Sequence, residues 1–244
     1  MWYNNIMDRN LVDMLGYGVD TFSFEDAVEY IMSHHGQIVT INPEMIEYAN
    51  KNSDLKKVIN NAEMVVPDGI GVQIGLKILG HNVKRVPGVD LGKELLKRAN
   101  YQKKSVAFIG AKPEVVKKAV NNIKSELADL NVVYSHDGYF ENNLEIFNEL
   151  KSCSPDLVLV ALGSPKQEFF ISELKSLLPD SVMIGLGGSF DVWAGAVKRA
   201  PVIYQKLGLE WLYRTITEPK RFKRIFPALP IFALKVFKER LLNK

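Results

Sequence analysis

The sequence lacks the features that mark several classes of protein. It has one cysteine, Cys153, so it can form neither a disulfide framework nor a cysteine-based zinc site. It contains no Gly-x-x-x-x-Gly-Lys-Ser/Thr loop, no His-Glu-x-x-His pair and no Gly-x-Ser-x-Gly turn, which argues against a P-loop enzyme, a zinc protease and an α/β-hydrolase. Asp-x-Asp is also absent, so a magnesium site for a nucleotide diphosphate has no obvious ligands. We therefore expect no metal and no cofactor.

Long hydrophobic runs are missing too. The longest apolar stretch, residues 225–234, is interrupted by Pro227 and Pro230. A helix that spans a bilayer needs ~20 apolar residues, so none is predicted. The first residues include Asp8 and Asp13 and have no apolar core segment, unlike a signal peptide. We expect a cytoplasmic protein.

Charge is unevenly distributed along the 244 residues. Residues 198–244 hold 12 Lys and Arg against 3 Asp and Glu, a balance of +9, whereas the rest of the chain has a balance of −6. Such asymmetry indicates an anionic partner for the tail: a membrane surface, a nucleic acid or a phosphorylated substrate.

Short apolar segments alternate with helical patterns through most of the chain. After a short hairpin over residues 11–20, buried strands are predicted at residues 38–41, 64–66, 105–110, 132–134, 157–162 and 182–186. Apolar strands at this spacing form a parallel sheet with helices on both faces. We predict an α/β, Rossmann-like domain over residues 1–195.

The pattern changes after Gly195. Residues 201–216 are predicted to form one amphipathic helix, and a second amphipathic piece ends the chain. Basic residues in this part alternate with aromatic and aliphatic ones, which favours an apolar interface over a nucleic-acid arm. Residues 196–244 are therefore predicted to be a basic, membrane-associating helical appendage.

Polar residues and glycines follow successive predicted strands. Carboxyl ends of parallel strands share one rim of the sheet, where nucleotides or sugars bind. Each residue also has a local alternative: a helix cap for Thr40, Asn42 or Asp68, a turn for Gly110, and a solvated first helical turn for Gln167. The candidate binding residues are Thr40, Asn42, Asp68, Gly110, Tyr139, Gln167 and Asp191.

A diphosphate bound without metal needs cationic side chains or backbone N–H groups around it. A solvated basic face is the alternative for most of the tail lysines. The candidates are Arg85, Lys198, Arg199, Arg214, Arg221 and Arg224.

At these residues the chain resembles the WecG/TagA/CpsF glycosyltransferases, glycosyltransferase family 26. The resemblance extends over nearly the whole chain, and the order and number of its short motifs make it specific. The motifs are TINPE at 40–44, PDG at 67–69, RVPG at 85–88, HDGYF at 136–140, GSPKQE at 163–168, GGSFD at 187–191, VKRAP at 197–201 and GLEWLYR at 208–214.

The resemblance implies an inverting, metal-independent transferase in teichoic acid or surface polysaccharide synthesis. Its donor would be a UDP-sugar, N-acetylmannosamine above all, and its acceptor N-acetylglucosamine on a polyprenyl diphosphate at the inner membrane face. The family's catalytic aspartate corresponds to Asp68, its polar substrate contacts to Thr40, Asn42 and Gln167, and its motif arginine to Arg85. The family tail corresponds to residues from about 196 onward.

Alternatives stay open at this point. Some relatives transfer glucose, other hexoses or N-acetylmannosaminuronic acid, and the residues do not distinguish the donors. A nucleotide-dependent oxidoreductase or epimerase is less favoured, because the glycines at 185–188 match the dinucleotide fingerprint poorly. Homo-oligomerisation is left open, and no nucleic-acid partner is expected.

Overall fold

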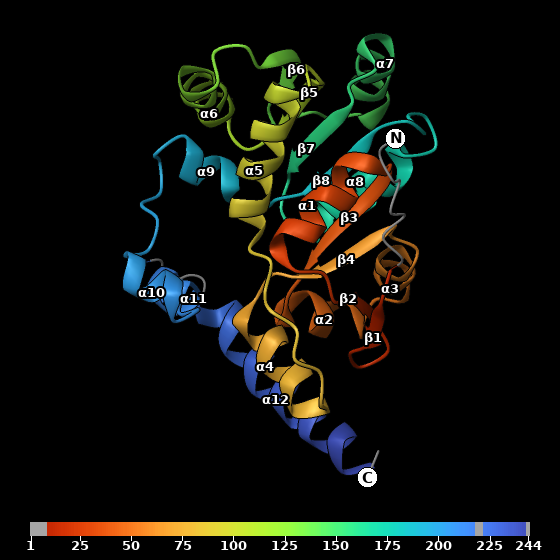
Figure 1. Ribbon diagram of the computed structural model, residues 1–244, viewed down its shortest axis with the longest axis vertical. Coiled ribbons are helices and arrows are strands. Elements are labelled where there is room, and N and C mark those ends of the chain that lie inside the picture. The colour runs from red at the N-terminus through yellow and green to blue at the C-terminus, as the bar shows by residue number, and fades with distance from the viewer. Residues whose placement is uncertain (1–8, 218–221, 243–244) are drawn as a thin grey trace, which may run out of the picture.

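Six parallel strands form the central sheet of the computed structural model, which describes residues 9–217 and 222–242 (Figure 1). Their spatial order is β4-β3-β8-β7-β5-β6. The strands are β3 (Gly36–Ile41), β4 (Met64–Pro67), β5 (Ser105–Gly110), β6 (Asn131–His136), β7 (Leu157–Ala161) and β8 (Val182–Gly185). Every residue of β4, β7 and β8 is buried, as expected for strands covered on both faces. The predicted Rossmann-like sheet is confirmed.

Helices cover both faces of this sheet. One face packs on α1 (Phe24–Ser33), α5 (Gly88–Tyr101), α6 (Pro113–Glu126) and α9 (Ser189–Trp193). The other packs on α2 (Pro43–Ala49), α3 (Ser53–Asn60), α7 (Asn143–Cys153) and α8 (Lys166–Leu174). The helices therefore follow the strands at the βαβ spacing seen in the sequence.

Two helix starts follow directly from local sequence. Ser23 caps α1 by accepting a hydrogen bond from Asp26 N, as the capping-box pattern predicts. Asn42 caps α2 by accepting from Met45 N at 3.0 Å, and Pro43 occupies the first helical turn, where its missing N–H costs no hydrogen bond. The predicted hairpin is also present, as β1 (Leu11–Asp13) paired antiparallel with β2 (Gly18–Asp20).

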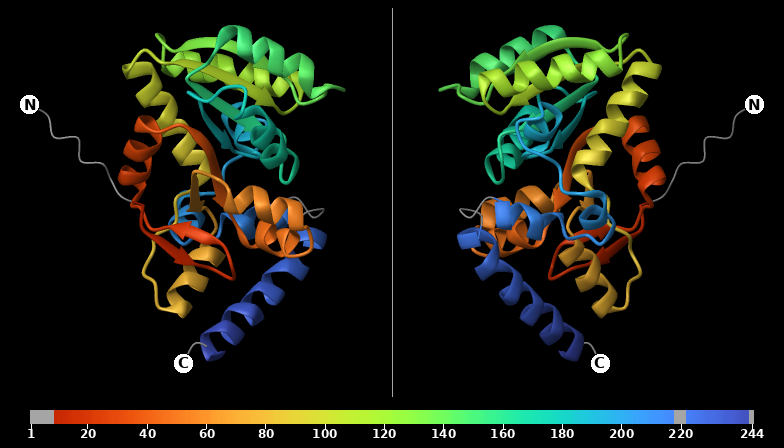
Figure 2. Two further views of the ribbon diagram at one scale, coloured as in Figure 1. Left: turned by 90° about the vertical axis from the view of Figure 1, so that its right-hand side faces the viewer. Right: turned by 90° about the vertical axis from the view of Figure 1, so that its left-hand side faces the viewer.

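The last helix, α12 (Phe222–Leu242), packs against α2 and α4 (Ile70–Leu79). Its Phe232 and Val236 are buried with Met14 and Leu76 in one apolar cluster. The helix continues through Pro227 and Pro230, although each proline removes a helical hydrogen bond. Figure 2 shows its C-terminal turns extending away from the sheet. The division of the chain at residue 195 stays a prediction.

The single helix predicted over residues 201–216 is wrong. Two helices occupy this part, α10 (Val202–Lys206) and α11 (Glu210–Thr217). Gly208 separates them with φ +71°, a conformation that side-chain-bearing residues rarely adopt, and a Cβ there would lie 2.8 Å from Ile70 Cγ1. Among the residues described, no helix is long and apolar enough to cross a membrane.

Candidate active site

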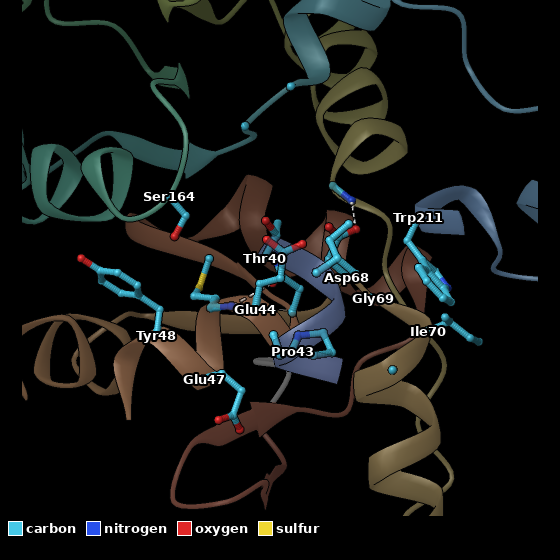
Figure 3. Close-up of a pocket in the computed structure, with 18 of the residues that line it drawn as sticks. Thr40, Pro43, Glu44, Glu47, Tyr48, Asp68, Gly69, Ile70, Ser164 and Trp211 are labelled. Carbon is cyan, nitrogen blue, oxygen red and sulfur yellow. Dashed lines mark hydrogen bonds between the residues drawn. The ribbon is translucent and has the colours of Figure 1, made fainter. Parts of the chain in front are cut away.

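A cavity of about 770 Å³ opens at the carboxyl ends of β4, β3, β8 and β7. This is the rim at which ligands bind in open parallel sheets. In Figure 3, Thr40, Glu44 and Asp68 lie near its middle, with Trp211 and Ile70 on one side and Tyr48 and Ser164 on the other. Its wall also includes Ile225 and residues 227–229 and 231 of α12, so the cavity joins a polar rim to an apolar flank.

Asp68 follows the last residue of β4 and lines this cavity. Its backbone N–H donates to Ile41 O at 3.0 Å, and its Oδ1 accepts from Gly88 N at 2.8 Å. Gly88 is the first residue of α5, so the carboxylate lies at a helix N-terminus, where the helix dipole favours negative charge. The alternative that Asp68 caps the helix after it is wrong, because Gly69 is the N-cap of α4 and no side chain bonds there.

Thr40 and Asn42 reach the same cavity from β3. Thr40 is buried and donates from Oγ1 to Gly185 O at 3.1 Å, which ties β3 to the end of β8. The Asn42 side-chain oxygen is engaged by the α2 cap already described. Both residues therefore have structural partners at the place where the sequence predicted substrate contacts.

Gln167 lines the cavity from the first turn of α8 and belongs to a buried polar network. Its Nε2 donates to Glu168 Oε1 at 2.8 Å, and its Oε1 accepts from Gly187 N at 3.0 Å. A Cβ at Gly185 would lie 2.5 Å from Gln167 Nε2, so the glycine makes room for this amide. Burial raises the pKa of Glu168, because a carboxylate in this interior loses its hydration. Together these contacts fix the loop between β8 and α9.

Arg85 lines the cavity from the segment between α4 and α5. Its backbone N–H donates to Gln73 Oε1 at 3.0 Å. Its guanidinium donates from Nη2 to Gln205 O and lies 3.8 Å from the Glu210 carboxylate, measured from Nη1 to Oε2. The cation is thus present at the cavity and has partners on the C-terminal part of the chain.

Three other predicted residues do not line this cavity. Gly110 ends β5 with φ +120°, and a Cβ there would lie 2.5 Å from the Ala161 carbonyl carbon. A residue with a side chain would clash at this position, which explains the glycine without a ligand. Tyr139 is 71% exposed in the segment after β6, and Asp191 lies in the first turn of α9. A ligand that reached all three would have to extend along the rim past β7.

The predicted cations Arg214, Arg221 and Arg224 cannot be compared with the cavity. Arg221 and the side chains of Arg214 and Arg224 lie outside the described residues, so their contacts with a substrate stay predictions.

Sequence reasoning missed several residues of the cavity. Glu44, Glu210 and Trp211 line the cavity. They belong to the motifs TINPE and GLEWLYR, so the sequence pointed to these segments, but no role was predicted for the three residues. Tyr48 carries no such signal and enters because α2 runs along the cavity. Asp90 also carries no such signal: it lies in the first turn of α5, whose N-cap is Pro87, and pairs with Arg199 at 2.6 Å.

The arrangement suits a reaction at a hydroxyl group. It offers a carboxylate that can accept a proton, a cation on the same cavity, and an open cavity with polar and apolar walls. In the parts of the chain that the structure describes, no group of three or more His, Cys, Asp or Glu residues could hold a metal ion.

Comparison with known proteins gives consistent matches. A model of the glycosyl transferase WecG/TagA/CpsF family matches residues 12–244. The chain is 41% identical over 221 residues to an N-acetylglucosaminyldiphosphoundecaprenol N-acetyl-beta-D-mannosaminyltransferase of Bacillus subtilis (strain 168), covering 89% of this chain and 86% of that protein. A protein of the same name from Bacillus spizizenii is 36% identical over 231 residues, covering 94% of this chain and 90% of the relative.

Proposed function

Since this chain is a glycosyltransferase of the WecG/TagA/CpsF family, we propose that it transfers N-acetylmannosamine from UDP to N-acetylglucosamine on undecaprenyl diphosphate. The names of both relatives state that sugar and that acceptor, and the matches cover most of each protein. The product would serve the synthesis of a cell-wall teichoic acid or a surface polysaccharide. UDP as the carrier of the donor is part of the proposal.

The position of the Asp68 carboxylate on the cavity wall is the observation that supports the mechanism. An inverting transfer needs a base that takes the proton of the acceptor hydroxyl while the sugar leaves its diphosphate. A carboxylate on the cavity wall, fixed by Gly88 N at 2.8 Å, suits that role. A positioned base contributes roughly 10²–10⁴-fold in rate. The acceptor hydroxyl attacks the anomeric carbon, the bond to the UDP oxygen breaks, and Asp68 receives the proton.

The departing UDP carries negative charge that the site must balance. Arg85 lies on the cavity, and the tail arginines Arg214, Arg221 and Arg224 are the further cations we assign to the diphosphates of donor and acceptor. Fixed cations stabilise the charge that develops in the transition state. Under this proposal the reaction needs neither a metal nor a cofactor. Gly110, Tyr139 and Asp191 would meet the nucleotide farther along the rim.

The acceptor carries a long prenyl chain, and the proposed location is the inner face of the cell membrane. The C-terminal helices expose large apolar side chains, and basic residues alternate with them in the sequence. An amphipathic surface of this kind binds at an anionic interface without crossing it. The exposed large apolar residues are Val202, Ile203, Leu207, Trp211, Ile216, Phe222, Phe226, Ile231, Leu234, Phe237, Leu241 and Leu242.

A donor panel tests this function. The full chain would be incubated with N-acetylglucosamine on a short-chain prenyl diphosphate and, separately, with UDP-linked N-acetylmannosamine, N-acetylmannosaminuronic acid, glucose and N-acetylglucosamine. We expect UDP release and a β-linked disaccharide with N-acetylmannosamine. Preference for glucose or the uronic acid would keep the glycosyltransferase and overturn the donor. UDP release that does not require the acceptor would contradict the proposed transfer.

A further inference from the structure

Four charged residues form a continuous series that begins at the cavity, which Arg85 and Glu210 line. Glu210, in the first turn of α11, lies between two arginines: its Oε2 is 3.8 Å from Arg85 Nη1, and its Oε1 is 3.4 Å from Arg199 Nε. Arg199 continues to Asp90, with 2.6 Å between Nη2 and Oδ2. We call Arg85, Glu210, Arg199 and Asp90 the ionic chain. Charges of opposite sign alternate along it.

The ionic chain joins two parts of the polypeptide. Arg85 and Asp90 belong to the segment before α5 and to its first turn, whereas Arg199 and Glu210 belong to the stretch that carries α10 and α11. Apolar packing holds α10 weakly, since α10 has no buried residue, whereas α11 contacts α12 and buries Thr215. Gly208 against Ile70 is a close apolar approach, and the hydrogen bond from Arg85 to Gln205 O is a further polar tie. Docking of the α10 end of this stretch therefore depends largely on the polar contacts of Arg85 and Arg199.

The position of Glu210 needs a physical reason. Its side chain is only 15% exposed and lines a cavity that, under the proposed function, receives two diphosphates. A negative charge there repels substrate, and its partial burial costs hydration energy. Two arginines compensate the burial. The location of Glu210 is explained by its contact with Arg85. A planar guanidinium held by Glu210 and by Gln205 O keeps its remaining N–H donors pointing in a fixed direction, in which they can bind an anion.

We propose that Glu210 is a positioning residue, which docks α10 and α11 on the cavity and holds the Arg85 guanidinium for the substrate diphosphate. Sugar transfer then depends on this docking, because Arg85 is oriented only while Glu210 is in place. The role given to Arg85 rests on the proposed function. The docking rests on the contacts alone.

A double-mutant cycle with two readouts tests the proposal. The full chain would be compared with Glu210→Gln, Arg85→Gln and the double variant. The first readout is hydrogen exchange of the backbone amides at residues 202–217, which reports local opening without any substrate. The second is kcat and KM for transfer. Glu114→Gln is the matched control, since Glu114 is also an acid in a first helical turn but is exposed and outside the cavity.

We expect Glu210→Gln to speed exchange at residues 202–217 by roughly tenfold, while the amides of β3 and β7 keep their protection. The kcat should fall by roughly tenfold or more, because a small displacement of an oriented group has effects of this size. Once Arg85 has been replaced by glutamine, Glu210→Gln should lower kcat no further. It should speed exchange by less than in the unmodified chain, because only its contact with Arg199 remains to be lost. Glu114→Gln should match the unmodified chain in both.

Two results would overturn the inference. Unchanged exchange at residues 202–217 in Glu210→Gln would show that the ionic chain does not dock these helices. Equal losses of kcat from Glu210→Gln with and without Arg85 would show that Glu210 does not act through Arg85. A full chain without any transfer activity would contradict the proposed function instead, and the exchange cycle would still decide whether Glu210 docks α10 and α11 through Arg85.

Discussion

Lys235 on α12 donates to Glu47 on α2 across 2.7 Å, and the Glu47 side chain is only 7% exposed. The pair therefore joins the last helix to the helix that carries Glu44 and Tyr48 along the cavity. Breaking such a pair from one side leaves a carboxylate that is buried and has lost its compensating charge.

Lys235→Met should therefore destabilise the protein although it keeps the apolar stem. We expect a loss of about 1–2 kcal/mol in the free energy of unfolding, below the value for fully buried pairs because Lys235 is 40% exposed. Urea denaturation would measure the loss. Lys238→Met, an exposed lysine one turn away, is the control. The double variant with Glu47→Gln should recover part of the loss, and equal effects of the two lysine variants would contradict this account.

The strands could be predicted from the sequence because each is a short apolar run between turn residues. Asp68 could be placed on the rim because it follows such a run. Its hydrogen-bond partner Gly88 could not be predicted, because Gly88 is 20 residues away and approaches Asp68 only when α5 packs on the sheet. Local patterns do not contain contacts of this kind.

The C-terminal part shows the same limit. Helical periodicity runs through residues 201–216, but contact with Ile70 at Gly208 divides it into α10 and α11. In α12, Pro227 and Pro230 suggested interruption, whereas burial of Phe232 and Val236 against the core accompanies a continuous helix. Glu210 stood in a predicted motif, but its place between two arginines is a tertiary fact.

The buried acid beside the cavity should make stability depend on pH. Burial raises the pKa of Glu168 in the folded state, so the folded protein binds this proton more tightly than the unfolded chain, whose value is near 4.5. Its contribution is fully present below pH 4.5 and is lost as pH rises through the folded-state pKa. Glu168→Gln should remove this part of the pH dependence. Urea midpoints measured from about pH 4 to 8 would check it, and identical slopes in both proteins would contradict it.

The exposed face of α12 should determine membrane binding. Leu234 and Phe237 are 70% and 55% exposed, whereas Val236 between them is buried. We expect Leu234→Glu/Phe237→Glu to weaken binding to anionic liposomes by roughly tenfold or more, since it removes apolar burial and adds negative charge. Flotation at low and high salt would measure it. Tyr101→Glu, at an exposed aromatic at the end of α5, is the control. A response to Tyr101→Glu as large as that of the double variant would contradict a role specific to α12.

Transfer should continue when divalent metals are removed. The proposed mechanism balances the diphosphate charge with Arg85 and the tail arginines, so an excess of EDTA should leave kcat unchanged within experimental error. Steady-state UDP release would be followed before and after chelation. Loss of turnover that Mg²⁺ or Mn²⁺ restores would contradict the metal-independent mechanism.

The catalytic role of Asp68 is the central claim, and single-turnover transfer by Asp68→Asn tests it most directly. The carboxamide oxygen of this variant can still accept from Gly88 N, so folding and UDP affinity should change little while basicity is lost. We predict that the rate falls by roughly 10²-fold or more. Asp156→Asn is the control, because Asp156 also accepts a backbone N–H, from Ser105 at 2.7 Å, but does not line the cavity. A folded Asp68→Asn protein that transfers sugar at the rate of Asp156→Asn would contradict the account.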